Sequence, residues 1–271
     1  MLNPQQIVQA YLEACRLDVE ALKPGNVSTA SPGHGMVAEE FLKSAQVSAV
    51  IMAEPGLTVG QRILGAVQAT HKAVGCNTNL GIVLLCAPLA QAALRGEPLS
   101  LVLEALDEHD AQAAYEAICL ASPAGLGRVP EHDVHQAPAV TLLQAMQAAA
   151  QRDRIAYQYA SAFEDVYGMG VTQLRGALAA GTSKPWAMTG VFLAFASAFP
   201  DSHIARKYGV SVAEQVRAEA LAQACAMKGG PPEANLKQWD QSLKARGLNP
   251  GTSADLSVAT WFALALEHSL K

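Results

Sequence analysis

Apolar residues recur at steps of three and four along most of the chain, the spacing that places side chains on one face of an α-helix. In the first such segment the apolar positions are Ile7, Tyr11, Ala14, Leu17 and Ala21. Asn3 followed by Pro4 is a typical helix start. The same spacing predicts further helices over residues 38–53, 58–73, 79–95, 109–121, 141–166, 184–199, 211–227, 234–245 and 253–270. No segment alternates β-branched and polar residues, so the pattern predicts an all-α fold.

Glycine and proline mark every break between these segments, and no break is long or polar enough to be a domain linker. We therefore predict a single domain over residues 1–271, a helical array around a central polar cleft. The longest apolar stretch, residues 80–94, is too short to span a bilayer and is typical of a buried core helix. The N-terminus lacks the basic start and apolar core of a signal peptide.

The amino-acid composition limits the classes of molecule that the protein could bind. The net charge is −5, with 19 Lys and Arg against 24 Asp and Glu, and no run of basic residues occurs. This balance argues against nucleic-acid binding but is compatible with a phosphorylated small molecule. The five cysteines are scattered and never form C-x-x-C, which is typical of buried thiols in a reducing compartment. We expect a cytoplasmic protein. Small residues on the helix faces are compatible with a homodimer, although no segment marks an interface.

The first polar break covers residues 23–36 and contains Lys23, Asn26 and His34 among several glycines. Glycines after an amphipathic helix allow the backbone to approach a ligand closely, and Lys23 could contact a phosphate as a point charge. A helix end followed by a surface loop explains the same residues, and the spacing alone favours that ordinary interpretation.

The second break, residues 75–81, leads into the most apolar helix and contains Asn77, Thr78, Asn79 and Gly81. Backbone N–H groups and side-chain amides at a helix start could bind an anion. A simple helix cap by Asn77 or Thr78 is an equally good explanation.

Two later breaks carry acids beside apolar helices. Asp201 is followed by His203, Arg206 and Lys207, a group that could hold a metal–phosphate pair with Asp201 on the metal and Arg206 on the phosphate. Asp255 follows Asn249-Pro250-Gly251 and opens a helix of large apolar residues. A carboxylate there would be partly desolvated and available as a metal ligand or a base. Capping explains both acids as well.

In this order and spacing, the segments resemble the triphosphoribosyl-dephospho-coenzyme A synthase family. The matching pieces are Lys23-Pro24-Gly25 with His34-x-Met36, Asn77-Thr78 with Gly81, Asp201-Ser202 with Arg206, and Asn249-Pro250-Gly251 with Asp255. The resemblance implies an all-helical enzyme that joins ATP to 3′-dephospho-coenzyme A. A 2′-hydroxyl attacks C1′ of the ATP ribose, adenine leaves, and the triphosphate stays attached.

The resemblance also implies roles for these residues. Asp201 and Asp255 would bind Mg²⁺ or act as the general base, and His34 would lie at the reacting end. Lys23, Arg206 and Lys207 would contact phosphates. The amide and hydroxyl side chains would orient ribose or phosphate oxygens; these are Asn26, Asn77, Thr78, Asn79 and Asn249.

The chain departs from the family pattern at three places. The family typically has His-x-Asp-Met, Asn-Thr-His-Lys-Gly and Arg-Gly-Gly, where this chain has His34-Gly35-Met36, Asn77-Thr78-Asn79-Leu80-Gly81 and Arg206-Lys207-Tyr208. Further segments, including residues 124–129, 152–153 and 158–159, resemble a distinct branch found in methanogens and methylotrophic bacteria. The branch makes a pterin-cofactor precursor a rival acceptor. The alternative outside catalysis is a nucleotide-binding or assembly protein that has kept the cleft and lost the chemistry.

Overall fold

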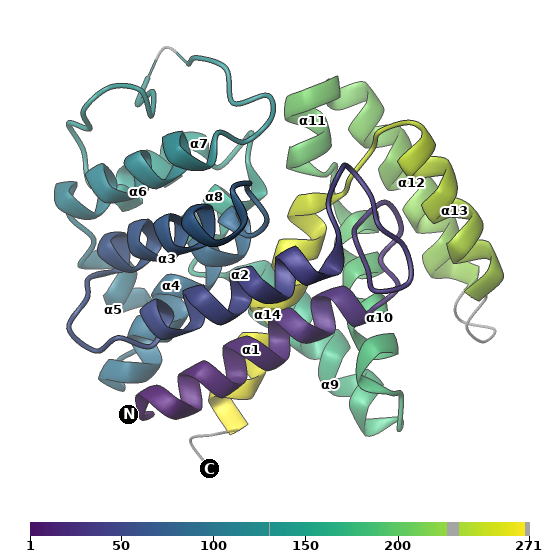
Figure 1. Ribbon diagram of the computed structural model, residues 1–271, viewed down its shortest axis with the longest axis horizontal. Coiled ribbons are helices and arrows are strands. Elements are labelled where there is room, and N and C mark those ends of the chain that lie inside the picture. The colour runs from purple at the N-terminus through teal and green to yellow at the C-terminus, as the bar shows by residue number, and fades with distance from the viewer. Residues whose placement is uncertain (130, 227–232, 269–271) are drawn as a thin grey trace.

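In the computed structural model, which describes residues 1–129, 131–226 and 233–268, every regular element is a helix (Figure 1). Within those residues no strand is present, and the predicted all-α fold is confirmed. None of the described helices combines the length and the apolar character that a membrane crossing would need.

The first half of the chain forms α1 (Pro4–Glu20), α2 (Ala38–Met52), α3 (Val59–Val74), α4 (Leu80–Arg95), α5 (Leu99–Glu104) and α6 (Glu108–Ala121). The second half forms α7 (Leu142–Ala149), α8 (Arg154–Ala160), the π-helix η1 (Asp165–Val171), α9 (Thr172–Ala179), α10 (Lys184–Ala198), α11 (Ser202–Tyr208), α12 (Val210–Ala226), α13 (Glu233–Ala245) and α14 (Gly251–His268). Two predicted helix ends, residue 227 and residues 269–270, lie outside the described residues. The predicted start of α1 is confirmed, because the side chain of Asn3 accepts a hydrogen bond from the backbone of Gln6.

The prediction of one helix over residues 141–166 is wrong. α7 ends at Ala149, and Asp153 starts the separate helix α8 by accepting hydrogen bonds from two backbone N–H groups of its first turn. After α8, Ala162 and Phe163 adopt the left-handed backbone conformation, with φ of 50° and 65°. The apolar spacing continues across both breaks, so it conceals them.

The pattern also fails to predict α5, η1, α9 and α11. Each of these helices has eight residues or fewer. A helix of about two turns is too short for a three- and four-residue periodicity to stand out.

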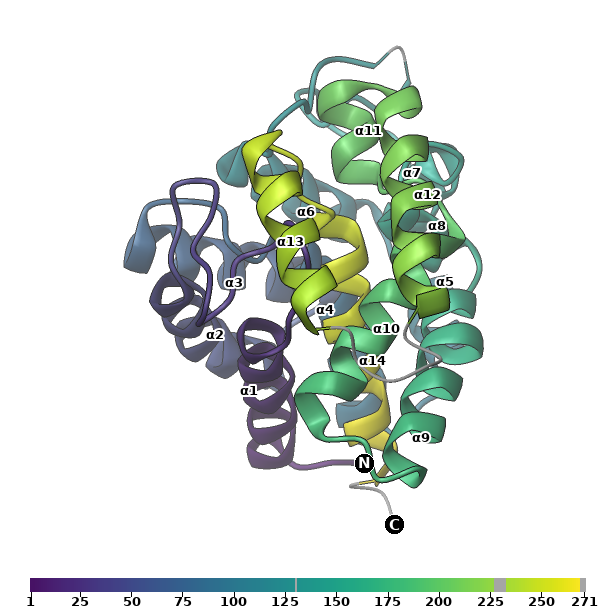
Figure 2. The same ribbon diagram turned by 90° about the vertical axis from the view of Figure 1, so that its right-hand side faces the viewer.

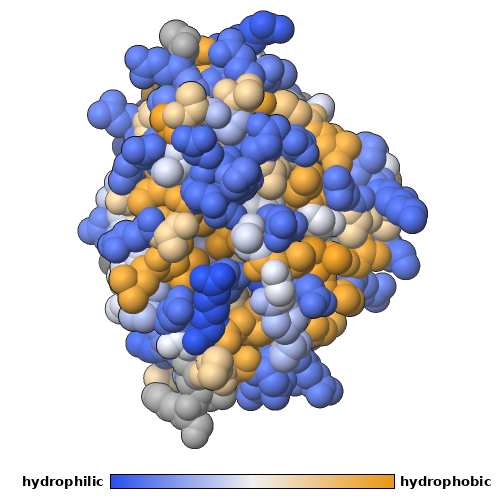
Figure 3. All heavy atoms as spheres, turned by 90° about the vertical axis from the view of Figure 1, so that its left-hand side faces the viewer, coloured by the Kyte–Doolittle hydropathy of each residue, from blue (hydrophilic) through white to orange (hydrophobic). Residues whose placement is uncertain are grey.

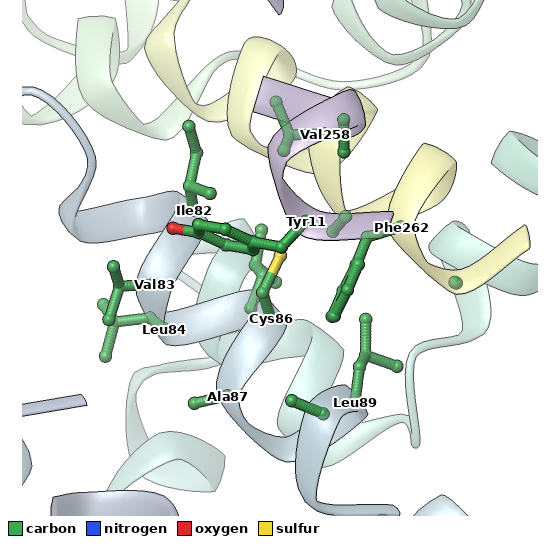
Figure 4. Close-up of a cluster of buried hydrophobic side chains, with 14 of the residues drawn as sticks. Tyr11, Ile82, Val83, Leu84, Cys86, Ala87, Leu89, Val258 and Phe262 are labelled. Atoms are coloured by element: carbon green, nitrogen blue, oxygen red, sulfur yellow. The ribbon is translucent and has the colours of Figure 1, made fainter. Parts of the chain in front are cut away.

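The main core forms where α14 passes between α1, α4, α10 and η1 (Figure 1). Tyr11 of α1 meets Phe262 of α14 edge to face, with ring centroids 5.8 Å apart. Figure 4 shows the two rings beside Cys86 of α4. The hydroxyl of Tyr11 lies 3.2 Å from Ser48 Oγ of α2, so the buried ring keeps a polar partner. The first helix of the chain is thereby packed against the last.

Helix α4 is the buried helix that the sequence predicts, even though it contains Pro88. Proline has no N–H, so the carbonyl of Leu84 one turn earlier loses its helical donor. The hydroxyl of Tyr159 from α8 donates to that carbonyl at 2.6 Å. The long-range hydrogen bond removes the cost of an unpaired buried acceptor and fixes α8 against α4.

The packing of α2, α3 and α6 includes a fully buried arginine. Arg62 of α3 donates to the carbonyls of Ile51 and Met52 at the end of α2, and to Gln91 of α4. Burial lowers the pKa of the guanidinium to about 10, so the group is still charged at neutral pH. A cation here offsets the unpaired carbonyls at a helix C-terminus.

A second, smaller apolar cluster joins α10, α11, α12 and α13. Figure 2 shows α12 and α13 side by side on the face with α10. Trp239 of α13 donates through Nε1 to Glu219 of α12 at 2.8 Å, and Arg246 pairs with the same carboxylate. This cluster holds the segment that leads from α13 into α14.

On the side of the molecule where α3, α5 and α6 lie, polar side chains are interspersed with apolar ones (Figure 3). The expected homodimer therefore stays a prediction, since this face does not single out an interface.

Candidate active site

The four sequence segments lie around one cleft with a volume of about 870 Å³. This size is within the range of small-molecule sites. Most of the predicted residues line it, namely Asn26, His34, Asn77, Thr78, Asn79, Arg206, Lys207, Asn249 and Asp255. Lys23 and Asp201 are buried and are not part of the lining.

Two segments that are far apart in the sequence meet at this cleft. Gly25 has a positive φ of 83°, and a Cβ at this position would lie 2.7 Å from Pro250 Cδ. Only glycine fits both the backbone conformation and the close approach. Beside it, Asn26 Nδ2 donates to Asn249 Oδ1 at 2.7 Å. Two carboxamides from opposite ends of the sequence are thus paired in the wall of the cleft.

Lys23 lies beneath this loop with a completely buried side chain. Its ammonium donates to Asp18 Oδ1 of α1, and its Nζ lies 3.4 Å from Asn26 Oδ1. The group expected to meet a phosphate therefore has a carboxylate partner behind the surface of the cleft.

Asp18 itself lines the cleft and is only 3% exposed. Asp18 is not among the site residues predicted from the sequence. A signal was present, because Asp18 follows Tyr11 and Ala14 on the buried face of α1 at helical spacing. An acid in an apolar stripe needs a partner or a function.

His34 lies at the entrance to the same end of the cleft and has a positive φ of 57°. Its Nε2 is 2.8 Å from the carbonyl of Gly25. Since a carbonyl can only accept, Nε2 carries a hydrogen. Nδ1 is then the ring nitrogen left to meet a ligand.

The start of α4 forms the opposite wall. Asn77 Oδ1 accepts from the N–H of Leu80 at 3.2 Å, which is the capping bond that the ordinary interpretation requires. Thr78 Oγ1 donates to Ser44 Oγ at 2.6 Å, and Asn79 Nδ2 donates to Ser48 Oγ at 3.4 Å. All three residues line the cleft; Asn77 also caps α4, and Thr78 and Asn79 join the start of α4 to α2.

Asp255 of α14 packs directly onto the first turn of α4. A Cβ at Gly81 would lie 2.0 Å from Asp255 Oδ2, so only glycine leaves room for the carboxylate. Within the described residues, no hydrogen bond reaches this carboxylate. Burial raises its pKa well above the usual range, and the negative charge of Asp18 adds to the shift. Asp255 is therefore a carboxylate that is open to a ligand.

Asp201 contrasts with Asp255 because both of its oxygens are occupied. Oδ1 accepts from the backbone N–H groups of His203 and Ile204, and Oδ2 accepts from the N–H and the hydroxyl of Ser253, each at 2.8 Å. Burial raises the pKa of the carboxyl, and these hydrogen bonds oppose that shift. Asp201 joins the start of α11 to the start of α14.

His203 lines the cleft beside Gly251, where a Cβ would lie 2.7 Å from its Nδ1. Burial lowers its pKa to about 4, and the charges of Arg206 and Lys207 contribute. The imidazole is therefore neutral at physiological pH and can both donate and accept a hydrogen bond.

Four cations line the cleft near α8 and α11, and one of them, Arg154, is held by two hydrogen bonds to Asp165. Arg206 pairs with Asp153 at 3.2 Å, Lys207 is exposed, and Arg152 is exposed with its Nη1 on the carbonyl of Ala148. Arg152 is a further lining residue that the predicted site does not include. Grouped guanidinium and ammonium groups of this kind suit a polyphosphate.

Apolar side chains of α4, α6, α7 and the loop over residues 122–138 form the remaining wall, among them Leu84, Ile118, Leu126, Leu142 and Met146. Asp133 holds that loop by accepting from Val129 N, His135 N and His135 Nδ1, and these bonds lower its pKa to about 2. An apolar wall of this kind reduces the water around reacting groups.

Among the described residues, no group of three or more His, Cys, Asp and Glu side chains is arranged to hold a metal ion by itself. A magnesium ion that arrives with a nucleotide needs less, since it commonly takes one or two carboxylates together with phosphate oxygens. Asp255 offers such a carboxylate.

Comparison with known proteins gives two results. The family model of the CitG proteins, ATP:dephospho-CoA triphosphoribosyl transferases, matches residues 4–271. A crystal structure assigned to a triphosphoribosyl-dephospho-CoA synthase from Archaeoglobus fulgidus is similar at a TM-score of 0.68 and 25% identity, over 84% of this chain and 97% of that one. None of the curated proteins matches. With the family model covering nearly its whole length, the chain belongs to the ATP:dephospho-CoA triphosphoribosyl transferase family and is a transferase of that family.

Proposed function

We propose that the cleft binds ATP and an acceptor nucleotide together and that its polar end carries out the triphosphoribosyl transfer. The single observation that carries this proposal is the contact between Asp255 and Gly81, which holds an unpartnered carboxylate where all four motif segments meet. A binding protein without chemistry has no use for a half-buried carboxylate that lacks a partner at this position.

The reaction builds positive charge on the ATP ribose as the bond to adenine breaks. A carboxylate near C1′ stabilises such an oxocarbenium-like state, as in glycoside hydrolysis. Asp255 is suited to this task because the cleft has already removed water from it. His34 offers Nδ1 at the same end, where it could hydrogen-bond the leaving base.

The triphosphate stays on the product and needs compensation for its charge throughout. Arg206, Lys207 and Arg152 line the cleft and would serve this purpose, whereas the fourth lining cation, Arg154, is already paired with Asp165. Lys23 would act indirectly, through Asp18 and Asn26, since its ammonium is buried beneath the wall.

Mg²⁺ is expected with ATP, and the residues fit a phosphate-bound ion. Asp255 would hold it, and when bound it would supply positive charge to the phosphates. Asp201 would support that site by fixing the start of α14 through Ser253, because its own oxygens are already occupied. Ribose and phosphate oxygens would be oriented by the paired amides Asn26 and Asn249 and by the α4 residues Asn77, Thr78 and Asn79.

We further propose that the chain belongs to the divergent branch with a changed acceptor. Leu80 lines the cleft where the family pattern has lysine, and Gly35 stands where it has an acid. Losing one cation and one acid changes which charged groups of an acceptor the cleft can pair. A pterin-cofactor precursor is therefore the second candidate acceptor, with the same donor chemistry.

The cellular setting is part of the same proposal. All five cysteines are free thiols, which fits a reducing cytoplasm where ATP is abundant. A homodimer is proposed on the small-residue helix faces, and light scattering of the purified protein tests it directly.

The decisive experiment combines the purified protein with ATP, Mg²⁺ and dephospho-CoA and measures free adenine by mass spectrometry. Adenine release that requires the acceptor, and a product that carries the intact triphosphate, would support the proposal. Release only with a pterin-type acceptor would identify the divergent reaction. ATP binding without adenine release for either acceptor would leave the binding or assembly role in its place.

A further inference from the structure

Asp18 has a geometry that the roles described above do not explain. It is 3% exposed, lies in the last turn of α1 and lines the cleft. The ammonium group of Lys23 donates a hydrogen bond to Asp18 Oδ1. Within the described residues, no hydrogen bond reaches Oδ2, so one oxygen of a buried carboxylate is left for the cleft.

We propose that Asp18 is the general base that deprotonates the attacking hydroxyl of the acceptor, and that Lys23 is its positioning residue. This inference rests on the proposed transferase reaction. It assigns a catalytic group to a helix that none of the sequence motifs includes.

The proton and electron balance is complete without a further reactant. The hydroxyl oxygen forms a bond to C1′ of the ATP ribose, and the bond from C1′ to adenine breaks with its electron pair on the adenine nitrogen. Asp18 removes the hydroxyl proton. The released adenine carries one proton away, which restores Asp18 to the carboxylate.

The other acids of the cleft are less suited to this step. Asp201 uses both oxygens in hydrogen bonds within the protein. Asp153 pairs with Arg206 and caps α8. Asp255 would bind the metal ion and stabilise the positive charge that develops on the ribose. Asp133 accepts hydrogen bonds through both oxygens from Val129 and His135. Asp18 is the remaining lining carboxylate with one fixed oxygen and one free oxygen.

Lys23 makes this arrangement specific. Its ammonium is completely buried and reaches Asp18 on one side and Asn26 on the other, and Asn26 in turn donates to Asn249. Because one oxygen of Asp18 is held by a charge, the carboxylate cannot rotate freely, and the second oxygen keeps one direction. A base must be held in this way to meet its proton at hydrogen-bond distance.

The test compares Asp18→Asn with the double variant Asp18→Asn/Lys23→Met in the adenine-release assay. Asp18→Asn should lower kcat by about 10²- to 10⁴-fold, the usual contribution of a general base, with little change in the KM for ATP. It also leaves Lys23 buried without its counter-ion, so the Tm should fall. The double variant removes both charges, and its Tm should recover while kcat stays low.

A matched control is available on α13, which contacts the same loop. Asp240 and Lys244 form a second ion pair at 3.0 Å, with side chains 5% and 14% exposed, and Asp240 also accepts from Gly25 N. This pair does not line the cleft. The variant Asp240→Asn/Lys244→Met should change the Tm without the large loss of kcat.

Three outcomes would contradict the inference. If the wild-type protein releases no adenine with either acceptor, the proposed function fails and the inference falls with it. If the wild type is active and the folded Asp18→Asn/Lys23→Met variant keeps its kcat, Asp18 is structural and only the inference is overturned. If the Asp240 and Lys244 control loses as much kcat as the Asp18 pair, the effect belongs to loop packing and not to a base.

Discussion

Two charged groups pack against helix α4, the fully buried guanidinium of Arg62 and the half-buried carboxylate of Asp255, and their surroundings differ. Near the later turns of this helix, the guanidinium of Arg62 donates to two carbonyls at the end of α2, to the carbonyl of Leu57 and to Gln91 of α4. Against its first turn, the carboxylate of Asp255 contacts Gly81 and has no hydrogen-bond partner among the described residues. Both charges have the sign that the nearby helix end favours.

The difference separates a charge that holds the fold from a charge that waits for a ligand. Arg62 replaces the water that the carbonyls of α2 would otherwise need, so its burial contributes to stability. Asp255 is desolvated, and no group of the described residues donates a hydrogen bond to it. Proteins keep such a residue where a substrate or a metal completes its surroundings.

The variant Asp255→Asn should have the largest effect and tests whether this carboxylate serves catalysis or the fold. We expect kcat for adenine release to fall on the order of 10³-fold, since the amide cannot stabilise developing positive charge. At pH 7 we also expect the variant to be more stable by about 1 kcal/mol, measured by urea unfolding. A variant that is less stable than the wild type would show that the carboxylate supports the fold.

The contribution of Asp255 to stability should depend on pH, and the direction of its pKa shift gives the sign. The pKa of Asp255 is raised in the folded protein, so the unfolded chain loses this proton at a lower pH than the folded chain does. Stability should therefore fall as the pH rises above the ordinary Asp pKa and through the raised value. Asp255→Asn should remove this part of the slope, which unfolding curves across that range would measure.

Arg62→Leu should have the opposite pattern. It leaves the carbonyls of Ile51 and Met52 and the amide of Gln91 without their donor, and we expect a loss of about 3 kcal/mol in the free energy of unfolding. The folded fraction should keep the wild-type kcat. Arg16→Ala, which removes an exposed pair with Glu20, is the control and should cost less than about 0.5 kcal/mol.

The variant Gly81→Ala, in the first turn of α4, tests how strongly catalysis depends on the position of the Asp255 carboxylate. The new Cβ would displace the carboxylate of Asp255, and a shift of about 1 Å at a reacting group can lower kcat by about 10²-fold. Gly176→Ala in α9, where the new Cβ meets open space, should leave kcat unchanged and stabilise the helix by about 0.5–1 kcal/mol. Equal kcat values for both variants would mean that the position of Asp255 is not critical.

His203 supplies the smallest effect. Its pKa is lowered to about 4 in the fold and is near 6.5 in the unfolded chain, so the unfolded state binds the proton first as the pH falls. Stability should decline between about pH 6.5 and pH 4, on the order of 1 kcal/mol. Thermal unfolding of His203→Gln should lack that decline. An unchanged slope would show that another group controls this range.

The long helices could be predicted because their apolar positions repeat over three or more turns. The short helices α5, α8 and α11 could not, since each depends on a local cap or on packing against distant residues. Asp153 illustrates this limit: its cap divides the predicted helix over residues 141–166, and no change in apolar spacing marks the division.

Much of the cleft could also be located from the sequence, because its residues follow glycine- and proline-rich breaks. The partners of those residues could not be predicted. Lys23 and Asp201 each belong to a motif, yet Lys23 pairs with Asp18 on the preceding helix, and Oδ2 of Asp201 accepts from Ser253 at the start of α14. Such choices depend on which helices meet, and a residue's neighbours in the chain carry little information about them.

The pairing of Asn26 with Asn249 has a consequence for how the protein is made. These residues are 223 positions apart, and Asp255 lies beyond the second of them. A ribosome that has delivered α1 to α13 has therefore produced most of the residues that line the cleft, but not Asn249, Asp255 or the helix around which the main core packs. The growing chain cannot bind its substrates as an enzyme until α14 emerges, so nucleotides present during synthesis cannot assist the folding of the earlier helices through this site.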